Sequence, residues 1–378
     1  MKAYPFTVKS PELIRPEIEK AVESGFEPAM AFVFTSVKKG IGAMSKAFKD
    51  AGFPVLGCST SGNILAGLAG NSSIYEDAAV VTLLSLRKEH FACRHADRGT
   101  RNSFEFGQEL GSWGVKAFKK PAFIILASGL GLDGQEFING ILDKAGDDTI
   151  MFGGLAGDDT RFRKTFVFSG SAVYDNGAAV MALDTAGVDV HGLATSGWIG
   201  LGKDLTITRA EGNVVYGIDN EPALGVYKKY LSVDDKDLPA IGVEYPLLIK
   251  REDGSESLRA VMGVDRKARS LIFAGSVPQD ATVSFSSSPG FEVMESTREQ
   301  INQFHAREPK ADVMLLFSCV ARHLALGPVI TEELSYPAGK WGKPLPGFFT
   351  YGEIGTNYGS KCDFYNQTYT LVLMKEKT

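Results

Sequence analysis

A glycine-rich pattern that occurs twice, far apart in the chain, constrains the fold more than any other feature of the sequence. Gly57-x-x-Thr60-x-Gly62-x-Ile64 matches Gly347-x-x-Thr350-x-Gly352-x-Ile354 position for position, and Gly153-x-x-Ala156-Gly157 is a looser third copy. Glycine is favoured where the backbone takes a positive φ or passes close to another segment. The pattern predicts equivalent turns at equivalent ends of related sheets; the alternative is a chance agreement between unrelated turns.

Short apolar runs alternate with helical patterns around these turns. The runs Ala31–Ser36, Ala122–Ser128 and Val313–Cys319 have the length and composition of buried strands, and a helical pattern covers Gln135–Lys144. Such alternation is typical of strand–helix–strand units. We therefore expect an α/β protein with mixed β-sheets and repeated strand–helix–strand units that end in the glycine-rich turns.

The 378 residues are enough for two or three domains. We expect residues 1–29 to be an N-terminal helical extension, with an amphipathic helix from Pro11 to Ser24. Residues 30–219 and 220–378 are expected to form two domains, with the boundary just before a helical pattern at Glu221–Leu231.

Charge and composition narrow the range of partners. The net charge is −5 and no Lys/Arg run is long enough to track a phosphate backbone, so nucleic acid is not expected as a partner. No apolar stretch approaches the ~20 residues that span a bilayer, so no membrane association is expected. The four cysteines include no CxxC pair, which argues against a zinc site and a disulfide framework. A reducing, cytoplasmic location is the expectation.

Motifs at both ends of the chain resemble the FIST family. Three of them occur in the order of the FIST C domain: Phe317–Arg322, Pro346–Ile354 and Asn366–Thr368. Upstream segments are similar to the FIST N domain, and these are Pro54–Gly62, Gly153–Asp158, and Gly197-Trp198 followed by Leu205–Thr208. The resemblance covers residues 30 to 374.

The resemblance implies a sensory module of intracellular signal transduction that binds small ligands such as amino acids. We therefore expect a ligand-binding sensor without catalytic activity or cofactor. Some bacterial members of the family are described as haem-containing nitric oxide sensors that act with a histidine kinase. The alternative is thus a haem-based sensor of this kind, with a histidine kinase or another signalling protein as partner.

Two charged residues are the first candidates for ligand contact. The guanidinium of Arg322 can grip a carboxylate through paired hydrogen bonds, and Glu353 can take a ligand ammonium group. Alternatively, the two side chains pair with each other. The remaining candidates lie in the glycine-rich turns or at strand ends: Cys58, Ser59, Thr60, Gly153, Gly154, Asp158, Ser318, Cys319, Tyr351, Asn366 and Gln367.

Cys319 and His323 support two further hypotheses. Positive charge from Arg322 and His323 would favour the Cys319 thiolate, which makes a thiol-dependent enzyme a third class of function. Alternatively, Cys319 is a buried apolar residue. No HxH or HExxH pattern occurs, and His323 is the first candidate for an axial ligand if haem binds.

One phosphate-loop pattern is better explained as a helix start. Gly129–Gly134 matches GxGxxG, but Asp133 would place a negative charge where a pyrophosphate should lie. Asp133 is therefore predicted to cap the following helix, and dinucleotide binding is not expected.

Overall fold

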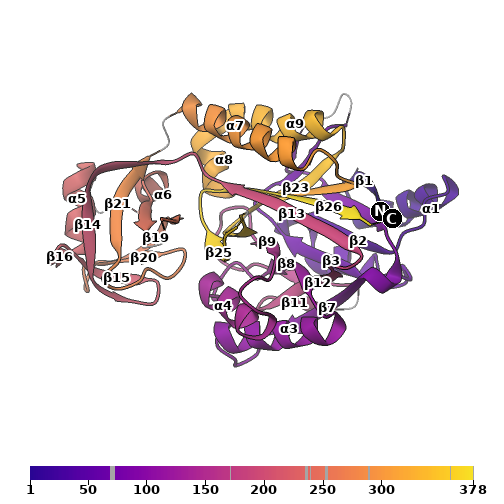
Figure 1. Cartoon of the computed structure of the whole chain (residues 1–378), viewed down its shortest axis with the longest axis horizontal. Coiled ribbons are helices and arrows are strands. Elements are labelled where there is room, and N and C mark those ends of the chain that lie inside the picture. The colour runs from indigo at the N-terminus through magenta and orange to yellow at the C-terminus, as the bar shows by residue number, and fades with distance from the viewer. Residues whose placement is uncertain are drawn as a thin grey trace.

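The computed structural model describes residues 1–68, 73–170, 172–234, 237, 238, 240–251, 254–287, 290–357 and 359–377. Figure 1 shows a large α/β body and, beside it, a smaller domain made mainly of strands. The body contains three six-stranded sheets, and each of them joins parallel and antiparallel strands. The expected α/β class with mixed sheets is confirmed.

The body consists of three copies of one arrangement. In each copy two parallel strands are connected through a helical segment, and a later strand of the same copy pairs antiparallel with the first of them. The first copy contains β1 (Lys2–Val8), α1 (Ile14–Glu23), β2 (Met30–Thr35), α2 (Ile41–Lys46), β3 (Val55–Ser59) and β6 (Ala79–Ser85).

The second and third copies follow the same order. The second contains β7 (Phe91–Asp97), α3 (Ser103–Ala117), β8 (Pro121–Ala127), α4 (Gly134–Ala145), β9 (Met151–Leu155) and β12 (Gly177–Asp184). The third contains β13 (Val188–Thr195), α7 (Phe291–Arg307), β22 (Val313–Cys319), α8 (Val320–Leu326), α9 (Ile330–Trp341), β23 (Leu345–Thr350) and β26 (Tyr369–Glu376). The predicted strand–helix–strand repeat is therefore present, and the looser glycine copy belongs to it.

Each copy gives a hairpin to the sheet of another copy. The hairpin of β4 (Asn63–Ala66) and β5 (Ile74–Tyr75) pairs with β23, and that of β10 (Val167–Phe168) and β11 (Val173–Tyr174) pairs with β3. The hairpin of β24 (Glu353–Thr356) and β25 (Cys362–Tyr365) pairs with β9. This cyclic exchange ties the three copies together through backbone hydrogen bonds.

The three sheets enclose a central core. Their inner faces supply buried side chains such as Phe34, Ile124, Phe152, Phe317 and Phe348. The outer face of each sheet is covered by helices of its own copy: α1 and α2, α3 and α4, and α7 to α9 (Figure 1). The central strands are buried on both faces, which explains why they appear in the sequence as continuous apolar runs.

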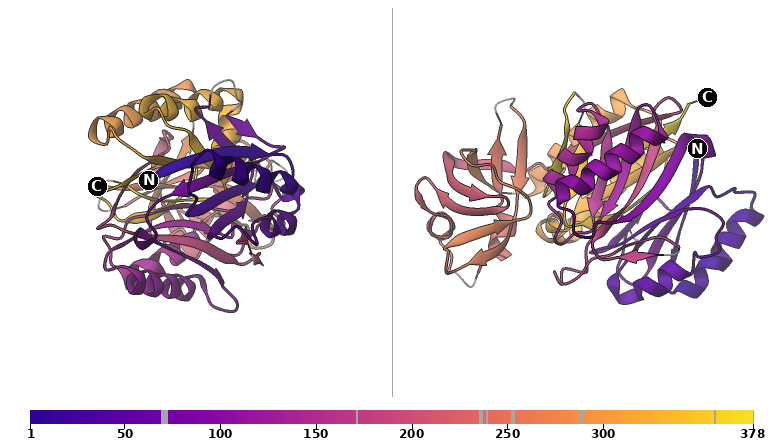
Figure 2. Two further views of the ribbon diagram at one scale, coloured as in Figure 1. Left: turned by 90° about the vertical axis from the view of Figure 1, so that its right-hand side faces the viewer. Right: turned by 90° about the horizontal axis from the view of Figure 1, so that it is seen from below.

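The smaller domain is inserted into the third copy, between β13 and α7. Its antiparallel strands surround a separate core that includes Tyr227, Phe273 and Phe285. The elements are β14 (Ile199–Glu211), β15 (Val214–Ile218), β16 (Glu221–Pro222), α5 (Ala223–Leu231), α6 (Ala240–Glu244), β17 (Leu247–Lys250), β18 (Glu256–Arg259), β19 (Val261–Asp265), β20 (Ser270–Phe273) and β21 (Thr282–Ser287). Figure 2 shows this inserted domain projecting from one side of the body.

The expected boundary between residues 219 and 220 lies inside the inserted domain. β15 and β16 pair across it, with Ile218 opposite Glu221. The inserted domain thus takes strands from both sides of that position, and residues 291–377 return to the body.

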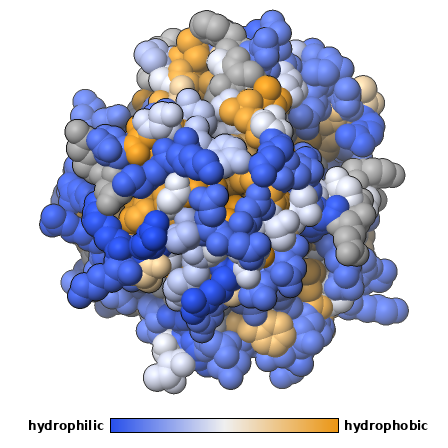
Figure 3. Space-filling view, turned by 90° about the vertical axis from the view of Figure 1, so that its left-hand side faces the viewer, coloured by the Kyte–Doolittle hydropathy of each residue, from blue (hydrophilic) through white to orange (hydrophobic). Residues whose placement is uncertain are grey.

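The face of the molecule that carries the inserted domain shows apolar residues among hydrophilic ones (Figure 3).

The N-terminal segment contains more than the expected helix. A one-turn 3-10 helix at Pro11–Leu13 leads into α1, close to the predicted start and end. Residues 2–8, however, form the edge strand β1, which pairs along its length with β6. The Met1 amino group lies 2.9 Å from a carboxylate oxygen of Glu376, so the two termini are adjacent. No helix in the described part of the chain is long and apolar enough to span a bilayer.

Candidate functional site

The three glycine-rich turns meet at one end of the body. There the three parallel strand pairs end, and the chain crosses from one sheet to another. Backbone hydrogen bonds join the turns in a ring: Ser61 to Phe349, Gly157 to Ser59, and Tyr351 to Leu155, each with an N···O distance of 3.0 Å. The predicted equivalence of the turns agrees with this topology.

Four predicted site residues form hydrogen bonds within and between these turns: Ser59, Thr60, Asp158 and Tyr351. Ser59 Oγ donates to the Gly157 carbonyl (2.6 Å), and Thr60 Oγ1 donates to the side chain of Asn63 (2.7 Å). Asp158 accepts a hydrogen bond from the Tyr351 hydroxyl and three from backbone N–H groups. These polar groups therefore satisfy each other inside the turn cluster.

Glu353 and Cys319 also lie close together, beneath the turns. Glu353 is buried; Oε1 accepts a hydrogen bond from Thr350, and Oε2 accepts one from Thr368 Oγ1 at 2.7 Å. Burial raises the pKa of Glu353 to about 8, because the charged form loses its hydration. Burial likewise raises the pKa of the Cys319 thiol, and the Glu353 charge adds to the effect. The expectation of an activated Cys319 thiolate is thus not supported.

Arg322 is paired, but with Glu333 on α9 and not with Glu353. Its side chain has 0% relative exposure, and Nε donates to Glu333 Oε2 at 2.8 Å. The other donors bind the Ser196 carbonyl, Thr297 Oγ1 (2.7 Å), the second Glu333 oxygen and the Gln367 carbonyl. Because every donor has a protein partner, Arg322 has none left for a ligand carboxylate. These contacts give Arg322 a structural role.

The remaining predicted residues are buried. A Cβ added to Gly153 would lie 2.0 Å from the Ile125 carbonyl, and one added to Gly154 would lie 2.4 Å from Thr350 Cγ2. These glycines permit close approach of strands. The other four candidates are buried at strand ends: Cys58, Ser318, Asn366 and Gln367.

His323 is half-buried on α8. Its ring stacks on Phe349 with centroids 4.2 Å apart and planes 12° apart. Burial lowers the pKa of His323, so the neutral imidazole is favoured. In the described part of the chain, no group of three or more His, Cys, Asp or Glu side chains is placed to hold a metal ion.

Two adjoining cavities lie elsewhere, and none of the predicted site residues lines them. The larger cavity, which we call the interdomain cleft, has a volume of about 1390 Å³. Its walls come from α4 and the segment after β24 on the body, and from β17, β18 and residues 276–279 of the inserted domain. Ligand sites are common at such junctions.

Polar contacts cross the interdomain cleft. Arg251 Nη2 of the inserted domain lies 2.6 Å from Asp363 Oδ2 on β25, and Ser276 Oγ donates to Asp133 Oδ2 at 2.5 Å. Asp133 also caps α4, accepting from the backbone N–H of residues 135 and 136 (3.0 and 3.1 Å), which confirms the predicted cap. Arg259 is buried, and its guanidinium binds the Ser276 and Phe364 carbonyls.

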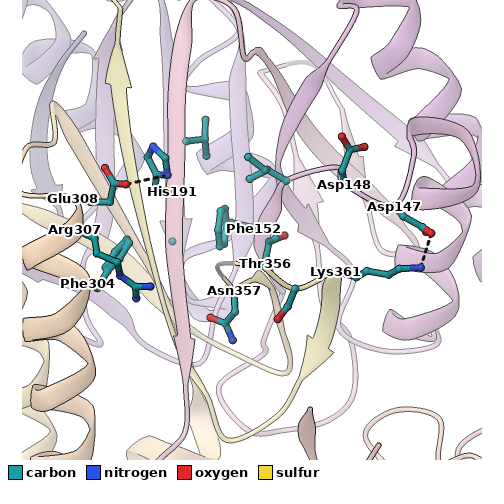
Figure 4. Close-up of a pocket in the computed structure, with 15 residues that line it drawn as sticks. Asp147, Asp148, Phe152, His191, Phe304, Arg307, Glu308, Thr356, Asn357 and Lys361 are labelled. Atoms are coloured by element: carbon teal, nitrogen blue, oxygen red, sulfur yellow. Dashed lines mark hydrogen bonds and ion pairs between the residues drawn. The ribbon is translucent and has the colours of Figure 1, made fainter. Parts of the chain in front are cut away.

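The smaller cavity, which we call the side groove, has a volume of about 580 Å³ (Figure 4). Phe152 and Phe304 supply apolar surface, and an added Cβ at Gly192 would lie 2.3 Å from the Phe152 ring. Two polar pairs lie at its rim: His191 is 3.6 Å from Glu308, and Lys361 is 2.5 Å from Asp147. Residues 359–361, with Asp147 and Asn357, line both cavities.

Sequence reasoning missed both cavities because no local pattern marks them. Arg251, Asp133 and Asp363 are more than a hundred residues apart, and the exchange of hairpins brings them together. The sequence predicts Asp133 as the cap of its own helix, but it does not predict the contact of Asp133 with Ser276 across the interdomain cleft.

Fold and cavities together define a repeat-built α/β protein with a ligand-sized cleft at the junction of its two parts. The FIST N domain model matches residues 29–221, and the FIST C domain model matches residues 223–356. The chain therefore belongs to the FIST family, whose domains are generally described as small-ligand-binding sensory domains of signal transduction. A search of curated proteins found no match.

Proposed function

We propose that this FIST protein is a sensor whose ligand, an amino acid or a similar small metabolite, binds in the interdomain cleft. The observation that carries the proposal is that both the body and the inserted domain line one cleft of about 1390 Å³. A ligand that contacts both walls binds one relative orientation of the two parts better than others, and so shifts their populations.

The charges of the cleft suit a ligand with a carboxylate and an ammonium group. Arg251, which directly follows β17, has a partly exposed guanidinium that pairs with Asp363 and donates to Ser255 and Ser257. The second arginine of the cleft, Arg259, is buried. On the facing wall, α4 presents the carboxylates of Glu136 and Asp143. The ligand carboxylate would compete with Asp363 for Arg251, and the ammonium group would lie against α4.

Both chain crossings between body and inserted domain contain a glycine with a positive φ. Gly197 (+74°) precedes β14, and Gly290 (+69°) precedes α7. Arg322 holds the Ser196 carbonyl beside the first crossing, and its guanidinium lies over the Trp198 ring at 5.5 Å. In this proposal the crossings absorb the change of orientation, as hinge residues do in other two-part binding proteins.

Calorimetric titration with each of the twenty amino acids tests the proposal. At least one is expected to bind, and Arg251→Ala should weaken that binding by about tenfold or more, because a charge-assisted contact is lost. Arg298→Ala is the matched control, since Arg298 forms an exposed ion pair with Glu332 outside the cleft. Unchanged affinity in Arg251→Ala would contradict the proposed site, and so would an equal loss in the control.

The alternatives from the sequence gain less support. Haem at His323 gains no support from the cavities, because His323 lines neither of them. A thiol-dependent reaction at Cys319 is opposed by burial of the thiol. A histidine kinase partner and a cytoplasmic location stay predictions. Absorbance spectra after haem addition would show a Soret band if haem binds at another residue.

A further inference from the structure

The segment between β9 and β10 forms a closed loop on the surface of the body. Ser59, fully buried at the end of β3, holds both ends of this loop: Oγ donates to the Gly157 carbonyl (2.6 Å) and accepts from the Phe166 N–H (2.8 Å). The backbone N–H of Asp159 adds a bond to the Thr60 carbonyl (3.1 Å). The end of β3, in the first copy, therefore fixes the base of this second-copy loop.

A buried carboxylate fixes the loop from inside. Asp158 accepts hydrogen bonds from the backbone N–H groups of Phe162, Arg163 and Lys164 at 2.9, 2.7 and 2.9 Å, and from the Tyr351 hydroxyl. Burial opposes its charge, but these bonds outweigh burial and hold the pKa of Asp158 below its usual value. The loop thus closes around a charged group of its own chain.

The backbone of the loop is strained. Asp159, Thr160 and Phe162 have φ values of +57°, +59° and +51°. The left-handed region is unfavourable for residues other than glycine, and most of all for a bulky side chain such as phenylalanine. Strain of this kind persists only where the surrounding contacts impose it, and it is concentrated at functional sites.

This strained backbone presents basic and aromatic side chains to solvent. Phe162 is 47% exposed, and its ring stacks on Tyr351 with centroids 4.7 Å apart. Arg161 and Arg163 are exposed on either side of it, and within the described residues neither forms an ion pair. Lys164 is also exposed and pairs with Asp175 (2.6 Å). Both acidic residues of the loop turn inward, since Asp159 accepts from Ser36 Oγ at 2.8 Å.

We propose that this tip, Arg161-Phe162-Arg163-Lys164, is a docking surface for an acidic segment of a partner protein that also offers an apolar contact for the Phe162 ring. Aromatic and arginine side chains carry most of the energy in protein interfaces, and complementary charge speeds and orients association. A tip that is fixed before binding loses little conformational entropy on docking.

Rigid orientation favours a protein over a lipid surface as occupant. A bilayer accepts a basic aromatic tip in many orientations and does not reward one fixed backbone geometry. A complementary protein surface, in contrast, binds one fixed backbone geometry more tightly than others. None of the tip residues lines the interdomain cleft or the side groove, so the docking surface is separate from the proposed ligand site.

The test is selection from a random-peptide display library on the full-length protein, with counter-selection on Phe162→Asn. Asparagine tolerates a positive φ, so this variant removes the ring while keeping the loop conformation. Arg161→Glu/Arg163→Glu is the second variant. Its matched control is Lys116→Glu/Lys119→Glu, which makes the same charge change at exposed lysines of the distant α3 end.

Enriched peptides are expected to be acidic with at least one apolar residue. Their affinity should fall about tenfold or more in either tip variant and stay unchanged in the lysine control. Three outcomes would overturn the proposal: no enrichment that depends on the tip, enrichment of neutral or basic peptides, or equal loss in the lysine control. Tip-dependent binding to phosphatidylglycerol vesicles without peptide selection would assign the surface to a membrane and also refute it.

Discussion

Replacing Arg322 should destabilise the fold, because it leaves a buried carboxylate without its cation. In Arg322→Met the Glu333 side chain, only 1% exposed, loses its sole ion-pair partner in the described part of the chain. Breaking a buried pair in this way costs about 3–5 kcal/mol. The Ser196 carbonyl also loses its hydrogen bond, which adds about 1 kcal/mol or more. We expect a total near 5 kcal/mol, a large fraction of the 5–15 kcal/mol typical of folded proteins.

The double variant Arg322→Met/Glu333→Leu separates the ion pair from the packing. Well-packed apolar residues in place of a buried pair are often neutral, so the double variant should lose only about 2 kcal/mol, chiefly from the Ser196 carbonyl. The double variant is then expected to be about 3 kcal/mol more stable than Arg322→Met. Arg298→Met on α7 breaks the exposed pair with Glu332 (3.0 Å) and should cost less than about 1 kcal/mol.

Urea unfolding followed by tryptophan fluorescence and far-ultraviolet circular dichroism measures these differences. The two signals should change together wherever a free energy is extracted. Trp198 lies beneath the Arg322 guanidinium, so its fluorescence reports on the surroundings of Arg322. The reasoning is refuted if Arg322→Met is as stable as the Arg298→Met control, or if the double variant is no more stable than the single one.

Two further predictions concern buried titratable groups. Burial raises the folded-state pKa of Glu353 to about 8 from an ordinary 4.5, so its neutral form is the stable one in the fold. The stabilisation that neutral Glu353 gives is complete below about pH 4.5 and is lost as pH rises through about 8. Because Glu353→Gln cannot ionise, its free energy of unfolding should increase relative to that of the wild type as pH rises through this window. The same pH dependence in both proteins would contradict the assignment. Among the four thiols, Cys93 is half-buried and the others are buried, so brief iodoacetamide treatment should label Cys93 first. Peptide mapping identifies the labelled thiols. Earlier labelling of Cys58, Cys319 or Cys362 than of Cys93 would show that burial does not control access.

Local sequence determined the features that depend on neighbours within a few residues. The apolar runs gave the buried strands, and their alternation with helical patterns gave the α/β class. Asp133 caps its own helix two and three residues on, so its role needed no distant partner. The paired glycine pattern predicted equivalent turns, and an added Cβ at Gly57 or Gly352 would lie within 2.5 Å of a phenylalanine ring, so a larger residue would not fit there.

Tertiary structure decided everything that depends on which segments meet. Arg322 pairs with Glu333 instead of Glu353 because α9 folds back over the end of β22, and eleven residues of spacing cannot show that. The strand β1 is stabilised by pairing with β6, some eighty residues away. The interdomain cleft exists because the third copy holds an insertion and sends its hairpin to the second copy. Residues such as Arg251 and Asp363 become a pair only through that exchange, and no local pattern in the sequence records it.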